Sequence, residues 1–231
     1  MIFSTSLPHT QARLLEPKTL GRLLGLSMLL EYVFEMASNF SWQEKLLTGP
    51  DLLARAATMR PLLGSSAMVD MVGAVIGIAL GVALMLRYQA QQPLLTRIYV
   101  GLLVALLAAS MTEDAVLMAM GRLGADLQSL GKPDAVDSVL AEHLLRALRV
   151  GIHLPTKLLG GFTLTLFFVL LGRARAIPRA LTIAGIVTAL IQMVAVGMGV
   201  FGFPVQLLLL VPIGLFYPAL GLWLTWRGLD R

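Results

Sequence analysis

The chain has no cysteine and very little charge. Without Cys, disulfide bonds and thiolate metal sites are excluded. Only 13% of the 231 residues are Asp, Glu, Lys or Arg, whereas a soluble domain usually carries about 25%. Hydrophobic residues make up 57% of the chain, and its mean hydropathy is +0.82. A chain this poor in charge cannot cover a water-facing surface, so its composition predicts a polytopic membrane protein.

Several chemical signatures are also missing. The net charge is +5, but Lys and Arg lie at the ends of apolar runs and form no basic stripe, so nucleic acid is not an expected partner. The twelve Met residues have no repeated Met-x-x-Met spacing, and the Glu-x-x-His pairs of di-iron bundles are absent. No phosphate loop or nucleophile motif occurs. We therefore expect no metal and no cofactor, and the motifs leave any catalytic residue unknown.

Six apolar segments are long enough to cross a bilayer, which takes about 20 residues per helix. They predict an all-α fold with a short cytoplasmic tail, residues 1–20, and a single transmembrane domain, residues 21–227. A polar connection, 41–67, follows the first span, and an amphipathic helix is expected to lead into the fourth. The expected spans are residues 21–40, 68–86, 98–120, 150–172, 180–201 and 205–226.

The distribution of basic residues predicts the orientation. Six spans place both termini on one side, and the segments on that side contain almost only basic charges, whereas the opposite segments are mixed in sign. Because cytoplasmic loops carry an excess of Lys and Arg, both termini are expected in the cytoplasm. The basic residues on the expected cytoplasmic side are Arg13, Lys18, Arg22, Arg87, Arg97, Arg173, Arg175, Arg179, Arg227 and Arg231.

Ionisable residues inside the predicted spans are the candidate site. With a rise of about 1.5 Å per residue across a core of about 30 Å, most of them lie in the outer half, and Lys157 shares a level with Glu113. Each costs about 2.5 to 3.5 kcal/mol in hydrocarbon, so they should face inward and pair. We predict that Lys157 lies within salt-bridge reach of Glu113 or Glu35, with His153 one turn above. The full set is Glu31, Glu35, Asp70, Glu113, Asp114, Arg149, His153 and Lys157.

Two interpretations of this set remain open. The acids outnumber the bases, so some carboxyl groups must be protonated, hydrated or bound to a cation, as in a polar cleft open to the outer face. Alternatively, the set consists of interhelical ion pairs and of outer residues that snorkel into the headgroups. A cleft suits a binding, sensing or accessory protein. The alternatives are an intramembrane enzyme, with Glu31, Glu35 or Glu113 as proton donor to an apolar substrate, and a proton- or cation-coupled carrier.

Glycine repeats every fourth residue in the second span, at Gly73, Gly77 and Gly81. This spacing strips one helix face of side chains and predicts a close helix-packing seam. The expected partners are therefore the lipid bilayer, a lipid or small apolar ligand in the cleft, and a second copy or another protein at the glycine seam.

Three short stretches resemble a known family. They are RLLG at 22–25, LLGRARAIPR at 170–179 and WLTWRG at 223–228. They are similar to the bacterial domain-of-unknown-function 4386 family, and the likeness in layout covers about residues 18–228. The resemblance implies a bacterial, multi-pass inner-membrane protein without an assigned activity, so it supplies no catalytic residues. Glu31 and Glu35 depart from the pattern expected of the first span.

Overall fold

The computed structural model describes residues 16–49, 51–131 and 136–230. In these ranges all regular structure is helical, and no strand occurs. The elements are α2 (Pro17–Ala37), the π-helix η1 (Ser38–Gln43), α3 (Glu44–Leu47), α4 (Leu52–Thr58), α5 (Arg60–Tyr88), α6 (Pro93–Ser129), α7 (Val136–Arg173), α8 (Arg179–Val200), the 3-10 helix η2 (Leu207–Leu210) and α9 (Val211–Arg227).

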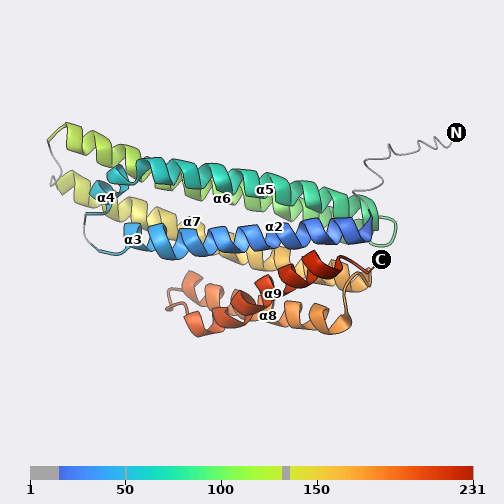
Figure 1. Ribbon diagram of the computed structural model, residues 1–231. Helices are drawn as coiled ribbons and strands as arrows, with labels where there is room; N and C mark the ends of the chain where they lie inside the picture. Colours follow the sequence, from blue (N-terminus) through green and yellow to red (C-terminus); the bar gives the residue numbers. More distant parts are fainter. Residues whose placement is uncertain (1–15, 50, 132–135, 231) are drawn as a thin grey trace.

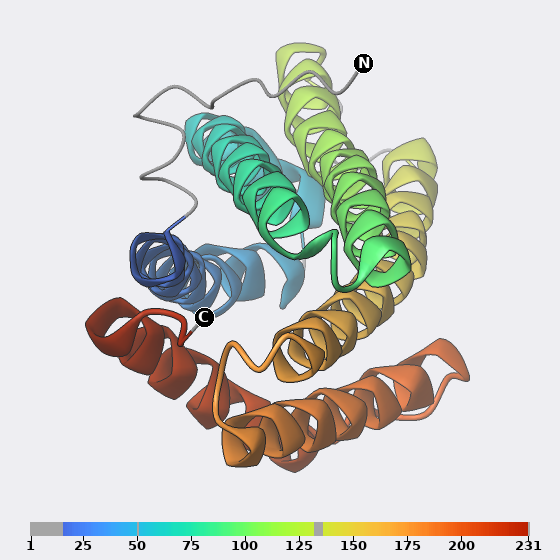
Figure 2. The same cartoon turned by 90° about the vertical axis from the view of Figure 1, so that its right-hand side faces the viewer.

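The long helices form a ring. Figure 1 shows them lying side by side, and the end-on view in Figure 2 shows the order α2, α5, α6, α7, α8, α9. Each helix packs against the next in this order, and α9 packs against α2 to close the ring. Leu229 N–H donates a hydrogen bond to the carbonyl of Pro17 at 3.2 Å, so the described N- and C-terminal ends meet at this closure.

The α2–α9 closure depends on glycine. A Cβ added to Gly25 would lie 2.5 Å from the carbonyl oxygen of Gly221, and one added to Gly21 would lie 2.2 Å from the amide nitrogen of Leu229. Both distances are far below a van der Waals contact, so these backbones approach as closely as only glycine permits.

The glycine stripe of α5 is not a continuous seam within the chain. A Cβ on Gly81 would lie 2.4 Å from Leu103 of α6, which is a close helix contact. A Cβ on Gly77 would meet only the carboxylate of Glu31, at 3.7 Å, and one on Gly73 would have nothing within 4 Å. The side chain of Glu31 lies beside Gly77, between α2 and α5, so the expected seam is limited to its Gly81 end.

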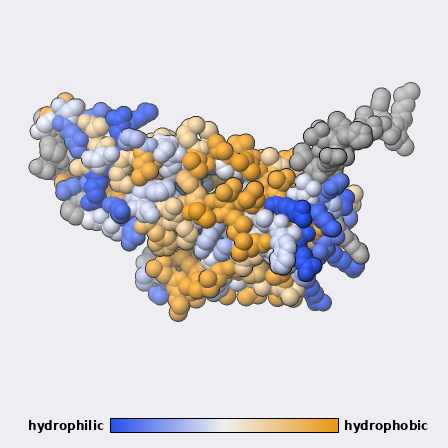
Figure 3. All heavy atoms as spheres, viewed as in Figure 1, coloured by the Kyte–Doolittle hydropathy of each residue, from blue (hydrophilic) through white to orange (hydrophobic). Residues whose placement is uncertain are grey.

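Five helices are long and apolar enough to cross a membrane, which supports a multi-pass membrane protein. They are Arg60–Tyr88, Pro93–Ser129, Ser138–Arg173, Arg179–Val200 and Leu207–Arg227. Their apolar side chains form a band across the middle of the molecule in Figure 3, with hydrophilic residues towards both ends. α2 falls outside this set by composition, because any 18-residue window of it contains at least three of Lys18, Arg22, Glu31 and Glu35.

Two helices are longer than a bilayer requires. α6 has 37 residues and α7 has 38, which corresponds to about 55 Å at a rise of 1.5 Å per residue. The amphipathic stretch expected before the fourth span is thus continuous with that span in α7. Its apolar residues Val139, Leu140, Leu144 and Leu148 are exposed.

The buried apolar residues form two clusters. One surrounds Leu84, Tyr88, Phe168 and Leu224, towards the Arg-rich end of the ring. The other joins α3, α4, α5 and α6 at the opposite end. On α5 and α6, the ionisable candidate residues fall between the positions that contribute to these clusters, and on α2, Glu31 and Glu35 follow the last position of the first cluster. The ring therefore holds a polar layer between two apolar ones.

Candidate functional site

The polar layer consists of side chains from five helices, and we call it the polar core. It contains all eight ionisable residues expected from the sequence, together with one tyrosine. α2 contributes Glu31 and Glu35, α5 Asp70, α6 Glu113 and Asp114, α7 Arg149, His153 and Lys157, and α9 Tyr217.

An ion pair crosses the ring. Lys157 Nζ on α7 donates to Glu35 Oε1 on α2 at 2.7 Å, although these helices are not neighbours in the ring (Figure 2). The side chains are 31% and 55% exposed, respectively, so the pair is reachable from outside the protein. This contact confirms the predicted reach of Lys157 to Glu35. Glu113, the other predicted partner, pairs elsewhere.

Glu113 is held by two bases of α7. Its Oε1 lies 2.8 Å from His153 Nδ1 and 3.2 Å from Arg149 Nη2. Arg149 and His153 are four residues apart and therefore share a helix face, and Lys157 continues that face by one more turn. Glu113 and Arg149 are only 9% and 8% exposed. A buried carboxylate and a buried guanidinium are tolerable there because each compensates the other.

The π-helix η1 connects this group to the end of α2. Arg149 Nη2 donates to Gln43 Oε1 at 2.8 Å, and Gln43 Nε2 donates to Ser38 Oγ at 2.9 Å. Ser38 and Gln43 are five residues apart, the period of a π-helix, so the wider turn places both on one face. The sequence pattern suggested a polar connection from residue 41 and did not reveal these two positions.

α9 contributes a further polar contact. Tyr217 O–H donates to Glu31 Oε2 at 3.0 Å, linking α9 to α2 within the apolar ring. Tyr217 was not among the expected site residues. The sequence does contain a clue to its role, which is a tyrosine inside an otherwise apolar span. A buried tyrosine hydroxyl usually needs a hydrogen-bond partner.

Two carboxyl groups have no such partners. Asp114 is 7% exposed, and its Oδ2 has no hydrogen-bond partner among the described residues. Asp70, partly buried on α5, makes no hydrogen bond or ion pair within the described ranges and is close enough to Asp114 for their charges to interact. Arg149 Nε is likewise buried without a partner there. The polar core is thus partly paired and partly unsatisfied.

The balance of charges determines what the polar core can do chemically. Five carboxyl groups face two permanent cations, Arg149 and Lys157, and one histidine. Excess carboxyl groups in a low-dielectric layer must bind protons, water or cations. Among the described residues, no three His, Asp or Glu side chains are grouped as metal ligands. The arrangement therefore offers acidic oxygens rather than a preformed metal site.

Comparison with known proteins agrees with the architecture. The family model described as "Domain of unknown function (DUF4386)" matches residues 23–228. No curated protein and no solved structure shows significant similarity to the chain. The matched range includes all residues of the polar core and every helix of the ring apart from the first six residues of α2. Because the match spans well over half of the sequence, the chain belongs to the DUF4386 family.

Proposed function

We propose that the chain crosses the bacterial inner membrane six times, with α2 as the first span and both termini in the cytoplasm. α2 is 21 residues long and completes the ring between α5 and α9. Its two carboxyl groups find partners inside the ring, Glu31 on Tyr217 and Glu35 on Lys157, which offsets the cost of placing them in the membrane. The Arg-rich end of the ring then faces the cytoplasm.

The proposed function is the binding or sensing of a cationic ligand that reaches the polar core from the outer face. The observation that carries this function is the excess of carboxyl groups, with Asp70 and Asp114 left without partners in the described ranges. A small inorganic cation would supply the missing positive charge. The half-exposed carboxylate of Glu35 is the point of entry.

Sensing would follow from the position of the Lys157–Glu35 pair. This pair joins two helices that are not neighbours in the ring, so it restrains the distance between α2 and α7 across the centre. A cation that binds Glu35 competes with Lys157 and weakens that restraint. The ligand thereby shifts the ring between two arrangements, provided that it binds one arrangement better than the other.

The residues towards the Arg-rich end favour binding over transport. Tyr88, Phe168 and Leu224 are almost completely buried in the apolar cluster on that side of the polar core. An ion passing to the cytoplasm would have to cross this cluster, at the cost of leaving its polar partners. A coupled carrier is therefore less well supported than a binding site open to one face.

Thermal unfolding of the purified protein in mild detergent tests the proposal. At constant ionic strength, NaCl or KCl should raise the melting temperature relative to the bulky cation N-methylglucamine. The shift should disappear in the double variant Asp70→Asn with Asp114→Asn. It should persist in the control Glu16→Gln with Asp126→Asn, which removes two carboxyl groups outside the polar core. Melting temperatures that do not depend on the cation would contradict cation binding. So would a cation-dependent shift that is reduced equally in both double variants.

A second function, intramembrane catalysis, is favoured by one observation. Asp114 is buried, and one of its carboxyl oxygens has no hydrogen-bond partner in the described part of the protein, which suits a proton donor acting on an apolar substrate. Native mass spectrometry of protein purified from bacterial membranes distinguishes the two functions. A co-purified apolar molecule that changes mass on incubation with the parent protein, but not with Asp114→Asn, would support an enzyme. An unchanged molecule would leave binding as the function.

A further inference from the structure

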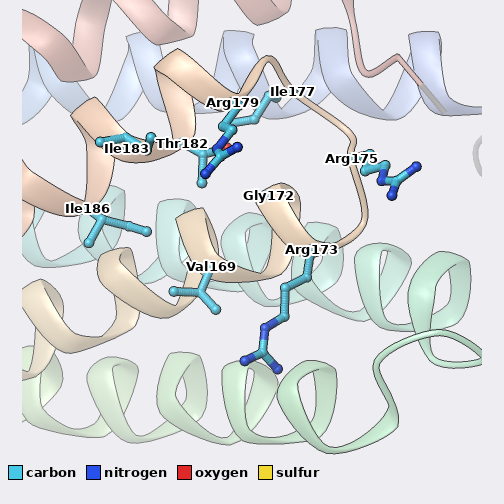
Figure 4. A pocket seen from close by; sticks show the side chains of 9 residues that line it. All are labelled: Val169, Gly172, Arg173, Arg175, Ile177, Arg179, Thr182, Ile183 and Ile186. Atoms are coloured by element: carbon cyan, nitrogen blue, oxygen red, sulfur yellow. The ribbon is translucent and has the colours of Figure 1, made fainter.

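A basic groove lies at the other end of the ring, where α7 passes into α8. Its volume is about 530 Å³. Figure 4 shows Arg179 beside Thr182, whereas the side chains of Arg173 and Arg175 extend outward from the rim of the groove. The apolar wall consists of Val169, Ile183 and Ile186 from the two helices. We call this feature the arginine groove; its basic residues are Arg173, Arg175 and Arg179.

The guanidinium groups of the arginine groove have no polar partners in the described part of the protein. None of them makes a hydrogen bond or an ion pair within the described ranges, and all three residues are exposed. In addition, α8 begins at Arg179, which lines the groove, and no side chain caps its first turn. Free guanidinium groups and uncapped helix amides both favour an anion.

The backbone at Arg175 is unfavourable for arginine. α7 ends in a hydrogen-bonded turn in which Ala176 N–H donates to Leu171 O at 2.8 Å and Arg175 N–H donates to Gly172 O at 3.1 Å. In this Schellman arrangement the residue before Ala176 adopts the left-handed conformation, and Arg175 has φ of 53°. Glycine is the usual residue there because it has no Cβ to strain. Arginine thus occupies a position at which the backbone conformation favours glycine.

The groove has a rigid base. A Cβ on Gly172 would lie 2.4 Å from Thr182 Cγ2, so the end of α7 and the first turns of α8 are in tight contact. Ala176 and Ile177 of the connection are buried, and Asp230 N–H donates to the carbonyl of Ala176 at 2.9 Å. The arginines therefore project from a fixed loop.

We propose that the arginine groove binds an anionic phospholipid of the surrounding leaflet. The arginines would hold the headgroup phosphate, and the acyl chains would lie along Val169, Ile183 and Ile186. This occupant follows from the combination of free cationic groups with an apolar wall at the end of two membrane-spanning helices, the level at which phosphates occur. Basic pockets between transmembrane helices bind anionic headgroups in the same way. The inference is independent of the function of the polar core.

Lipid binding can be measured by native mass spectrometry of the full-length protein titrated with dioleoylphosphatidylglycerol or dioleoylphosphatidylcholine. Phosphatidylglycerol should bind at least tenfold more tightly. The variant with Arg173, Arg175 and Arg179 all changed to Gln should lose this preference. A charge-matched control in which Arg22, Arg97 and Arg227 are changed to Gln should keep it within threefold, because these arginines lie at the same end of the ring but do not line the groove.

Arg175→Gly separates the binding role from the structural one. Glycine relieves the left-handed backbone, so the melting temperature should rise while the affinity for phosphatidylglycerol falls severalfold. Equal affinities for the two lipids would overturn the proposal. An equal loss of the preference for phosphatidylglycerol in the groove variant and the control variant would also overturn it. Displacement of phosphatidylglycerol by millimolar inorganic phosphate would assign the groove to free phosphate and would also overturn it. A lower melting temperature in Arg175→Gly with unchanged lipid affinity would assign Arg175 a structural role only.

Discussion

Replacing Lys157 by Met should destabilise the protein more when Glu35 is present than when Glu35 has already been replaced by Gln. The single change Lys157→Met leaves the carboxyl group of Glu35 in the polar core without the one partner that it has among the described residues. Leaving a buried polar group without a partner costs about 1 to 3 kcal/mol, and the half-exposed carboxyl group of Glu35 should fall at the lower end of this range. The double variant removes both charges, so its cost should be smaller than the sum of the two single costs.

The expected coupling can be estimated from the geometry. Two unit charges 2.7 Å apart attract by about 6 kcal/mol at an effective dielectric constant of 20. Desolvation and ordering of two long side chains offset most of this attraction, and both side chains retain substantial exposure. Interhelical polar contacts in membranes reach at most about 1.7 kcal/mol in double-mutant cycles. We therefore expect a coupling free energy of about 1 to 1.5 kcal/mol, equivalent to about 3 to 5 °C in melting temperature.

The assay is thermal unfolding of the parent protein, the two single variants and the double variant in one detergent. The control cycle combines Arg22→Gln with Glu35→Gln. These residues are thirteen positions apart on α2, or about 20 Å, so their effects should add within about 0.5 kcal/mol. If the Lys157–Glu35 cycle is as additive as the control, the pair does not restrain α2 against α7.

Three other predictions concern packing and topology. Gly81→Leu should lower the melting temperature by several degrees because its Cβ would overlap Leu103, whereas Gly73→Leu should leave it nearly unchanged, as measured by the same unfolding assay. Gly25→Ala should lower the melting temperature by a comparable amount by opening the α2–α9 closure, and an unchanged value would contradict that contact. In intact cells, a membrane-impermeant thiol reagent should label Leu130→Cys but not Gln91→Cys, and the reverse pattern would contradict the proposed orientation.

The common level of the ionisable residues along the helices could be predicted from the sequence, but of their pairs only Lys157 with Glu35 could. A constant rise per residue placed Glu35, Glu113, His153 and Lys157 in neighbouring turns, and the structure brings them into one layer. Equal depth does not determine which helix faces which, because this depends on the order and rotation of helices in the ring. Lys157 therefore reaches Glu35, whereas Glu113 pairs with His153 and Arg149.

Local irregularity concealed other parts of the site. The helical path continues past Ala37 through the π-helix, so Gln43, which was expected in the polar connection, accepts a hydrogen bond from Arg149 of the polar core and donates one to Ser38. The regular glycine spacing in α5 also gave an incomplete account of packing. Close backbone approaches also occur at Gly21 and Gly25 of α2, whose neighbours on α9 and beyond it are more than 190 residues away in sequence. Close packing between two helices that are far apart in sequence produces no periodic pattern within either helix, so it could not be predicted from the glycine spacing.

Thiol accessibility at position 35 tests whether the polar core is reachable from the outer face. The chain has no cysteine, so single-cysteine variants carry no background. A charged, membrane-impermeant methanethiosulfonate reagent added outside intact cells should modify Glu35→Cys. It should not modify Val33→Cys, whose side chain is exposed on the apolar surface of α2 and would face lipid. Failure to modify position 35, or equal modification of both positions, would contradict an outward-facing polar core.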